Sequence, residues 1–373
     1  MKQGWEIKKL GEVCTFCSGY TPKESELLEC GAVPYFKVSD MNHCDNLKYL
    51  THTSLFLEDG CKVYPKHTIV FPKNGAAIST NKKRILAQDS VVDLNTGGVV
   101  ANDALVYFEY LYLYFLNLDF RLHTRRGAVP TLDIAELKNK SIPVPPREEQ
   151  ERIVAELDCL SGVIERKREQ LKQLDALAQS IFYQMFGDPI TNEKGWEVCE
   201  LQKVSTLLNG RAYKQNELLD EGKYKVLRVG NFFTNSNYYY SDLELEPEKY
   251  CDDGDLLFAW SASFGAFIWN GGKVIYHYHI WKVLYDHQKL NIDYYRFLLN
   301  TMTSYFMKDV HGIGMVHLTK AGMEQYILPI PPLTLQQQFA DKIEAIEKQK
   351  ELIKQSITQT EELFNSRMDY YFN

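Results

Sequence analysis

The sequence lacks the features of a membrane-spanning or secreted chain. No apolar run approaches the ~20 residues of a membrane span; the run at 111–118 contains two tyrosines. The segment Met1–Trp5 lacks the apolar core of a signal peptide. Eight cysteines spread over 373 residues, without a secretion signal, are typical of reduced thiols. We therefore expect a cytoplasmic protein.

The sequence also lacks charge of one sign and any catalytic signature. A net charge of −7 argues against a general polyanion binder, and the acid is spread along the chain, so a nucleic-acid surface must be a local patch. Gly312-Ile313-Gly314 lacks the strand and helix of a phosphate-binding loop. The Asn-Pro-Pro-aromatic signature of an adenine methyltransferase is missing. These absences argue against a nuclease or methyltransferase that works alone.

Metal-ligating patterns are incomplete. Cys14-x-x-Cys17 has zinc-ligand spacing, but no second pair follows it. His277-x-His279 and the pair His311 and His317 come without a carboxylate motif, so DNA contact or core packing explains them better. We expect no metal and no cofactor in this chain.

What the sequence does contain is its own first half repeated. The segment Gly4-Trp5-Glu6-Ile7 returns as Gly195-Trp196-Glu197-Val198, a spacing of 191 residues between Trp5 and Trp196. Leu10, Val13 and Gly19 return at the same spacing as Leu201, Val204 and Gly210. Two Pro-rich hinges, Ile142–Pro146 and Leu328–Pro332, are 186 residues apart. Each copy is large enough to be a domain, and a duplicated chain is suited to a two-part target or to two copies of a partner.

A long helix follows each hinge. Apolar residues alternate at intervals of four and three residues, which predicts two coiled-coil seams, each interrupted by one lysine (Lys167, Lys350). The seam residues are Ile153, Leu157, Leu160, Ile164, Leu171, Leu174 and Ile181 in the first helix, and Phe339, Ile343, Ile346, Ile353, Ile357 and Phe364 in the second. Equivalent places in a duplication favour antiparallel pairing of the helices with each other. The spacing between copies falls from 186 at Ile153 to 182 at Ile164, which predicts that the second helix is four residues shorter around Leu157–Ile164.

The parts before the helices are predicted to be α/β domains of irregular, twisted sheet. Residues 1–146 and 189–331 are the two globular parts, and residues 147–188 and 332–373 are the two spacer helices. Short apolar runs predict strands, and clusters such as Asn95–Gly98 are expected to bound them. The predicted strands are Thr68–Phe71, Leu105–Phe108, Leu256–Phe258 and Lys282–Tyr285, and shorter helices are expected at Tyr110–Asn117 and Ile292–Asn300.

These features together resemble the specificity subunit of Type I restriction–modification systems, over essentially the whole chain. The resemblance rests on the repeated Trp-x-x-x-x-Leu-x-x-Val opening, the segment Gly254–Phe258, and the two hinges with Gln150 and Gln336 before heptad helices. The first copy departs from it at His67–Phe71, where a Gly-Asp-Leu-Leu-Phe segment is expected.

The resemblance implies two tandem, pseudo-symmetric target-recognition domains and no catalytic site in this chain. Each domain would read one half of a bipartite, asymmetric target with an adenine methylated at N6. The partners implied are double-stranded DNA, two methyltransferase subunits and restriction subunits in the full complex, and S-adenosylmethionine, ATP and Mg would belong to those partners. Two alternatives stay open: a partner that fuses methylation and cleavage in one chain, and a coiled-coil adaptor that binds no DNA.

Base reading requires polar or aromatic groups on loops, with further Lys and Arg on phosphates. The basic clusters Lys82–Arg84 and Arg125–Arg126 are the strongest candidates. The full set of residues expected to contact DNA is Lys73, Asn74, Lys82, Lys83, Arg84, Arg125 and Arg126 in the first copy, and Arg211, Lys214, Arg228, Trp260, Ser261, His277, His279 and His317 in the second.

Overall fold

The computed structural model describes residues 4–58, 63–125, 127, 129–233, 237–261, 263–309 and 318–373. The chain divides into two compact units. Unit 1 comprises Met1–Arg168 and Gln355–Asn373, and unit 2 comprises Glu169–Lys354. The boundary crosses both long helices, so each unit holds one globular part together with a portion of each helix.

Unit 1 contains a five-stranded sheet of order β2-β9-β6-β7-β4 and a three-stranded sheet of order β5-β3-β8. β4 pairs with β7, and β3 with β8, in parallel; the other neighbours are antiparallel. Two short antiparallel pairs, β1–β12 and β10–β11, complete the unit. The bounds are β1 Glu6–Lys9, α1 Leu10–Val13, β2 Cys14–Ser18, β3 Val33–Phe36, β4 Tyr49–Leu50, β5 Phe56–Leu57, β6 Ile69–Pro72, β7 Arg84–Leu86, β8 Val91–Val92, β9 Thr96–Ala101, α2 Phe108–Asn117, β10 Thr124–Arg125, β11 Thr131–Leu132, α3 Ile134–Asn139 and β12 Ser141–Val144.

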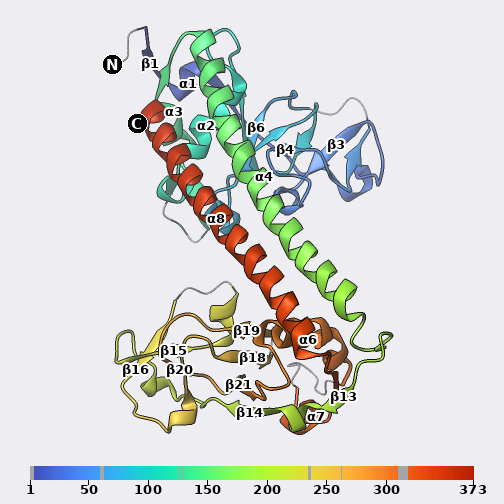
Figure 1. Ribbon diagram of the computed structural model, residues 1–373. Coiled ribbons are helices and arrows are strands. Elements are labelled where there is room, and N and C mark those ends of the chain that lie inside the picture. The colour runs from blue at the N-terminus through green and yellow to red at the C-terminus, as the bar shows by residue number, and fades with distance from the viewer. Residues whose placement is uncertain are drawn as a thin grey trace. The chain divides into compact units, whose positions relative to one another are not determined.

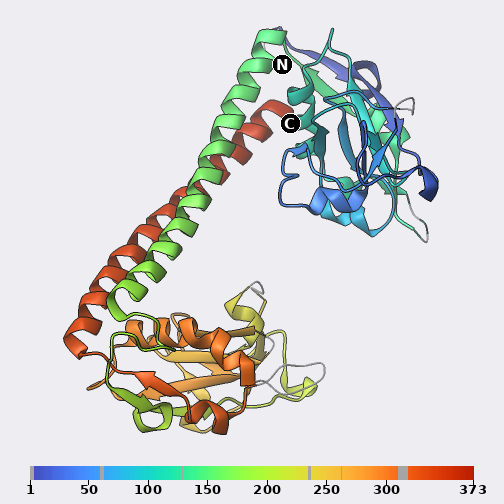
Figure 2. The same ribbon diagram turned by 90° about the vertical axis from the view of Figure 1, so that its right-hand side faces the viewer.

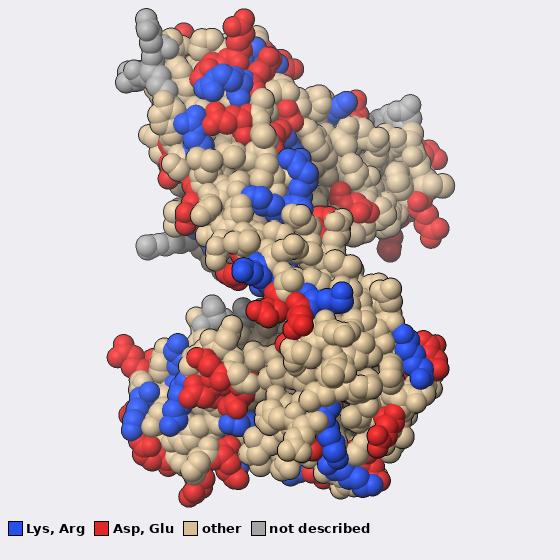
Figure 3. Space-filling model, viewed as in Figure 1, with Lys and Arg blue, Asp and Glu red and all other residues tan. Residues whose placement is uncertain are grey.

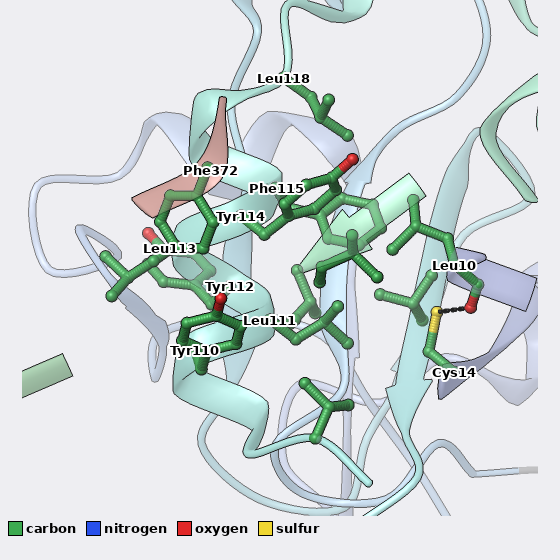
Figure 4. Packing of buried hydrophobic residues seen from close by; sticks show 14 of the residues in the cluster. Leu10, Cys14, Tyr110, Leu111, Tyr112, Leu113, Tyr114, Phe115, Leu118 and Phe372 are labelled. Atoms are coloured by element: carbon green, nitrogen blue, oxygen red, sulfur yellow. Dashed lines mark hydrogen bonds between the residues drawn. The ribbon is translucent and has the colours of Figure 1, made fainter. Parts of the chain in front are cut away.

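The core of unit 1 is organised around α2, in which every residue from Tyr110 to Phe115 is buried. Because buried hydroxyls need hydrogen-bond partners, the tyrosines fix the helix. Tyr110 donates to the carbonyl of Pro143 at 2.9 Å, which ties α2 to β12. The ring of Phe372 lies 5.2 Å from that of Tyr110 and 5.8 Å from that of Tyr114 (Figure 4). The C-terminal end of the second long helix is therefore part of this core.

Unit 2 repeats the plan with two four-stranded sheets, β14-β21-β18-β19 and β16-β15-β20-β17, and the antiparallel pair β13–β22. Tyr294 of α6 donates to the carbonyl of Pro329 at 2.8 Å, as Tyr110 does to Pro143. The bounds are β13 Val198–Glu200, α5 Leu201–Val204, β14 Ser205–Asn209, β15 Tyr224–Leu227, β16 Tyr239–Ser241, β17 Tyr250–Cys251, β18 Leu256–Ser261, β19 Ser263–Ile268, β20 Val274–Tyr276, β21 Ile280–Tyr285, α6 Ile292–Phe306, α7 Lys320–Glu324 and β22 Ile327–Pro329. The predicted α/β fold is confirmed (Figure 1).

Two local predictions are wrong. The run Leu105–Phe108 was expected to be a strand, but Tyr107 is the residue that precedes α2, and the helix begins at Phe108. Gly97 and Gly98 were expected in a loop, yet both lie inside β9. A Cβ on Gly97 would stand 2.8 Å from the ring of Phe71, so this strand needs glycine to pack against the neighbouring strand.

The long helices are α4 (Arg147–Phe186) and α8 (Leu333–Phe372), which run antiparallel in each unit (Figures 1 and 2). In unit 1, Glu156 of α4 pairs with Arg367 of α8, and further along α4 Lys167 donates to Ser356 of α8. In unit 2, Lys350 binds Asp175 at 2.7 Å. The predicted antiparallel coiled coil is thus confirmed within each unit.

The seam residues are buried or half-buried at every predicted position. The local shortening does not make the second helix shorter overall, because both helices contain 40 residues. The second helix lacks four residues near its start but continues four residues further at its end. Within the described residues, neither these helices nor any shorter one is long and apolar enough to cross a membrane.

Candidate nucleic-acid interface

The connection between β20 and β21, residues 277–279, is held by three segments distant in sequence. His277 donates its backbone N–H to the carbonyl of Leu227 at 2.9 Å, and Tyr278 donates to that of Arg211 at 3.0 Å. The N–H of Trp260 donates to the carbonyl of His279 at 3.1 Å. Sheet pairing thus assembles a cluster of basic and aromatic side chains at one place on unit 2.

The aromatic side chains of this cluster contact one another. The ring of Tyr278 lies 3.9 Å from that of His279 and 4.7 Å from that of His277. Trp260 donates its indole N–H to the carbonyl of Tyr278 at 2.9 Å, which fixes the indole beside the connection. Tyr278 is 38% exposed. Exposed rings of this kind can stack on bases or contact thymine methyl groups.

Two arginines lie beside this cluster. Arg228 is exposed, and its guanidinium lies 5.4 Å from the centre of the Tyr239 ring. Arg211 is held by two hydrogen bonds to Glu217, at 2.8 and 2.9 Å, so its charge is largely compensated. Burial, together with the neighbouring His279 and Arg228, lowers the pKa of His277 to about 4. His277 is therefore neutral near pH 7, and a neutral imidazole can both donate to and accept from a base edge.

Unit 1 repeats this backbone arrangement in its β8–β9 connection, residues 93–95. Equivalent residues make the same hydrogen bonds in both units, at nearly the same distances. Gly19 N donates to Thr96 O as Gly210 N does to Ile280 O, both at 3.2 Å, and Tyr20 N donates to Val92 O as Arg211 N does to Tyr276 O, both at 3.0 Å. Asp93 N donates to Phe36 O at 3.0 Å, as His277 N does to Leu227 O at 2.9 Å. Lys73 N donates to Asn95 O at 2.8 Å, as Trp260 N does to His279 O at 3.1 Å.

The side chains on the matched frame differ between the units. In unit 1 the connection carries Asp93, Leu94 and Asn95, where unit 2 has His277, Tyr278 and His279. Leu94 is 52% exposed, and Asn95 is also exposed. Lys73 takes the position of Trp260, and its ammonium donates to the hydroxyl of Ser18 at 2.9 Å. Asn74, the next residue, is half-buried and bridges to Thr131.

The basic run Lys82–Arg84 is a structural element, which corrects the prediction that it forms a DNA-contacting patch. Lys83 is 1% exposed, and its ammonium donates to the carbonyl of Leu118 at 2.6 Å and to Asn81 at 2.7 Å. Burial lowers the pKa of Lys83 to about 7. The guanidinium of Arg84 donates hydrogen bonds to backbone carbonyls, including that of Met41 at 3.2 Å.

The remaining candidates are placed as follows. Lys82 is half-buried and donates to Asn42. Arg125 is exposed and pairs with Asp133 at 3.0 Å. Ser261 is 1% exposed, so its prediction as a DNA contact is wrong for this conformation. Arg126 and His317 lie outside the described residues.

Sequence reasoning missed three exposed residues beside these connections. Lys23 and Lys37 lie 191 residues before Lys214 and Arg228, so the spacing of the duplication could have identified them. Tyr278 stands between His277 and His279, so its place next to two predicted DNA contacts could have identified it. On the face shown in Figure 3, basic and acidic side chains are interspersed.

Two groups in unit 1 have metal-ligand chemistry. Burial raises the pKa of the Cys14 thiol to about 12, and the protonated sulfur donates to the carbonyl of Leu10 (Figure 4). Within the described residues, His43, Asp45 and His52 bring ligand atoms within 4.8 Å of one another. The two imidazoles stack with centroids 4.0 Å apart.

Comparisons with known proteins agree with the duplication. The family model for the Type I restriction modification DNA specificity domain matches the chain twice, over residues 2–176 and 193–362. The MjaVIII specificity subunit of Methanocaldococcus jannaschii is 21% identical over 406 residues, covering 96% of this chain and 90% of the relative. The MjaIX specificity subunit of the same organism is 25% identical, covering 60% of this chain and 57% of the relative.

Two solved structures share the fold. One comes from work on complex assembly and conformational transition of the type I R-M system; it has a TM-score of 0.62 and 18% identity, and the match covers 100% of this chain and 98% of that one. The other is the S subunit of a Type-I restriction-modification system from M. genitalium, with a TM-score of 0.55, 12% identity and coverage of 99% and 96%.

Proposed function

The chain belongs to the Type I restriction–modification DNA specificity family, and we propose from this that it selects the DNA target of such a complex without catalysing a reaction. Each unit reads one half of a bipartite, asymmetric target. One observation carries the proposal: the two units hold the same backbone frame but display different side chains on it. Equal frames dock on DNA in the same way, and unequal side chains select different bases.

The long helices support a role in setting the gap between the half-targets. Half-sites one helical turn apart are separated by about 34 Å. A helix of 40 residues measures about 60 Å at 1.5 Å per residue, which is sufficient for a spacer of that size.

The same helices offer docking residues for two methyltransferase subunits. α8 exposes Leu363 (49%) and Tyr370 (57%) in unit 1, and the helices of unit 2 expose Leu177 (48%) and Leu352 (60%). Large apolar side chains exposed on a helix mark partner surfaces when several occur together. Each unit thus exposes large apolar side chains on its helices, which fits two copies of one partner.

The deciding experiment is co-expression with the cognate methyltransferase subunit, followed by mapping of N6-methyladenine in the host DNA. We expect a single motif made of two unlike half-sites separated by a fixed number of unread bases. A complex that co-purifies but methylates no defined motif would overturn the proposal and favour an adaptor role.

Docking is tested separately by native mass spectrometry of the purified complex. Leu363→Glu with Tyr370→Glu, or Leu177→Glu with Leu352→Glu, is expected to remove one methyltransferase subunit of two. Gln170→Glu with Gln173→Glu, at exposed positions of α4, adds the same charge and is expected to leave both subunits bound. Retention of both partners in the two double variants would place docking elsewhere.

A further inference from the structure

Two basic positions are common to both units, whereas the residues of the neighbouring β8–β9 and β20–β21 connections are not. Lys23 in unit 1 corresponds to Lys214 in unit 2, and Lys37 corresponds to Arg228. All four side chains are exposed. Among the described residues, none of the four has an ion-pair partner.

The backbone at these four positions is fixed in the same manner. The N–H of Lys23 donates to the carboxylate of Glu26 at 2.8 Å, and that of Lys37 donates to Asp40 at 2.7 Å. Unit 2 repeats both bonds at 2.8 Å, from Lys214 to Glu217 and from Arg228 to Asn231. Each basic residue therefore has an anchored backbone and an exposed cationic end.

These positions lie beside the connections described above. Lys37 directly follows Phe36, whose carbonyl accepts from Asp93, and Lys23 is three residues after Tyr20, which donates to Val92. The matched hydrogen bonds place Arg228 and Lys214 in the same relation to the β20–β21 connection. Arg228 also helps to depress the pKa of His277, as expected for a cation close to that ring.

The connections themselves change charge between the units, which is incompatible with a shared phosphate contact. Asp93 of unit 1 stands where unit 2 has the neutral His277. A carboxylate is repelled by phosphate but accepts from the amino group of a base. Positions that keep their charge suit the backbone of DNA, which is the same at every base pair, and positions that change suit the bases.

Resting on the proposed function, we propose that Lys23 and Lys37 in unit 1, and Lys214 and Arg228 in unit 2, are equivalent phosphate contacts that hold each unit on DNA regardless of sequence. The β8–β9 and β20–β21 connections then read the bases, with Asn95 and Tyr278 as their most accessible specific contacts.

The test uses the purified complex of this chain with its methyltransferase subunits, and two DNA duplexes: one with the mapped motif and one with that motif scrambled. Lys23→Gln with Lys37→Gln is expected to weaken binding to both duplexes about tenfold and to lower the salt dependence of log K by about 1.8, the value for two lost phosphate contacts. Lys214→Gln with Arg228→Gln should do the same. The methylated motif should stay unchanged in both.

Controls come from the opposite ends of two strands that lead to the connections. Lys66 precedes β6, which leads to Lys73, and Lys203 precedes β14, which leads to Gly210. Both are exposed lysines. Lys66→Gln and Lys203→Gln are expected to change neither affinity nor salt dependence.

The proposed base-reading residues, Asn95 and Tyr278, should behave in the opposite way. Tyr278→Ala is expected to alter or relax one half of the motif and Asn95→Ala the other, each with less than a twofold change in binding to scrambled DNA. A double Lys variant that changes the motif, or that binds scrambled DNA as well as the wild type does, would overturn the inference. If the wild-type complex yields no split motif, the proposed function itself fails, so the two failures are distinguishable.

Discussion

The side-chain oxygen of Gln150 accepts a hydrogen bond from the backbone N–H of Tyr107 at 2.7 Å, which ties the start of α4 to the residue that precedes α2. Its side-chain nitrogen donates to the carbonyls of Leu105 and Pro145, at 3.1 and 2.9 Å, and the residue is 1% exposed. Unit 2 repeats the network at Gln336, with Asn291 as donor and the carbonyls of Lys289 and Pro331 as acceptors, all at 2.8 Å.

Gln150→Ala is expected to destabilise the protein by about 2–4 kcal/mol, because one N–H and two carbonyls lose buried partners. Gln336→Ala should cost a similar amount in unit 2. Gln337→Ala, one residue along and exposed, is the control and should change stability by less than about 0.5 kcal/mol. Urea unfolding of the full chain measures all three. Equal midpoints for Gln150→Ala and Gln337→Ala would contradict the structural role of the network.

Gly19→Ala is expected to abolish reading by unit 1. A Cβ at this position would stand 2.0 Å from the carbonyl oxygen of Asp93 and 2.2 Å from that of Val92, so the β8–β9 connection would have to move. Methylation mapping of the co-expressed complex should then show the unit 1 half of the motif relaxed or all methylation lost.

The matched control for that substitution is Gly162→Ala in α4. Its Cβ would meet only the flexible guanidinium of Arg166, at 3.4 Å, and helix propensity favours alanine over glycine by about 0.5–1 kcal/mol. Gly162→Ala should therefore raise the unfolding midpoint and leave the motif intact. An unchanged motif in Gly19→Ala would show that the connection tolerates displacement.

The features that could be predicted from the sequence are those set by local periodicity or by the spacing of the duplication. The helix seams follow from the alternation of apolar residues, and the structure buries or half-buries each of them. The close approach at Gly19 follows from its match with Gly210. Lys83 could not be predicted, because its burial depends on the carbonyl of Leu118, at the distant end of α2. A basic run looks the same in sequence whether its partners are backbone carbonyls or phosphates.

Lys83→Met is expected to destabilise unit 1 by about 1–3 kcal/mol, since the carbonyl of Leu118 loses its donor, and to leave DNA affinity unchanged at temperatures where the unit is folded. Lys82→Met, the neighbouring half-buried residue, should have a smaller effect on stability. Thermal unfolding and DNA binding are the two measurements. A loss of affinity without a loss of stability would return Lys83 to the DNA interface.

The pKa of Lys83 adds a pH signature to that comparison. The folded pKa is about 7, below the ordinary value of 10.5, so between those values the unfolded chain binds a proton that the folded chain does not. The contribution of Lys83 to the free energy of unfolding therefore rises as the pH increases from about 7 to 10.5. The difference in stability between the wild type and Lys83→Met should widen from pH 7 to pH 10.

His277 predicts a separate dependence in unit 2. Its folded pKa is about 4, below the ordinary value of 6.5, so the unfolded chain binds more protons between these values and unit 2 loses stability as pH falls from 6.5. His277→Gln should flatten this loss. Urea unfolding at pH 5 and pH 7 measures it; a variant that loses as much stability as the wild type would assign the acid sensitivity to other groups.

The seam lysine Lys350 is expected to lower the stability of the protein and to fix a single helix register. Burial lowers its pKa, but hydrogen bonds to Asp175 and Glu347 more than compensate and keep the ammonium charged. Replacing a charged seam residue with an apolar one removes a desolvation cost, and also removes a contact that only one register can make. Lys350→Leu should therefore raise the unfolding temperature. The number of bases between the two methylated half-sites should become variable. Lys348→Leu, on the exposed face of α8, should change neither quantity. If the number of bases between the half-sites is as constant as in the wild type, the apolar seam alone sets the register.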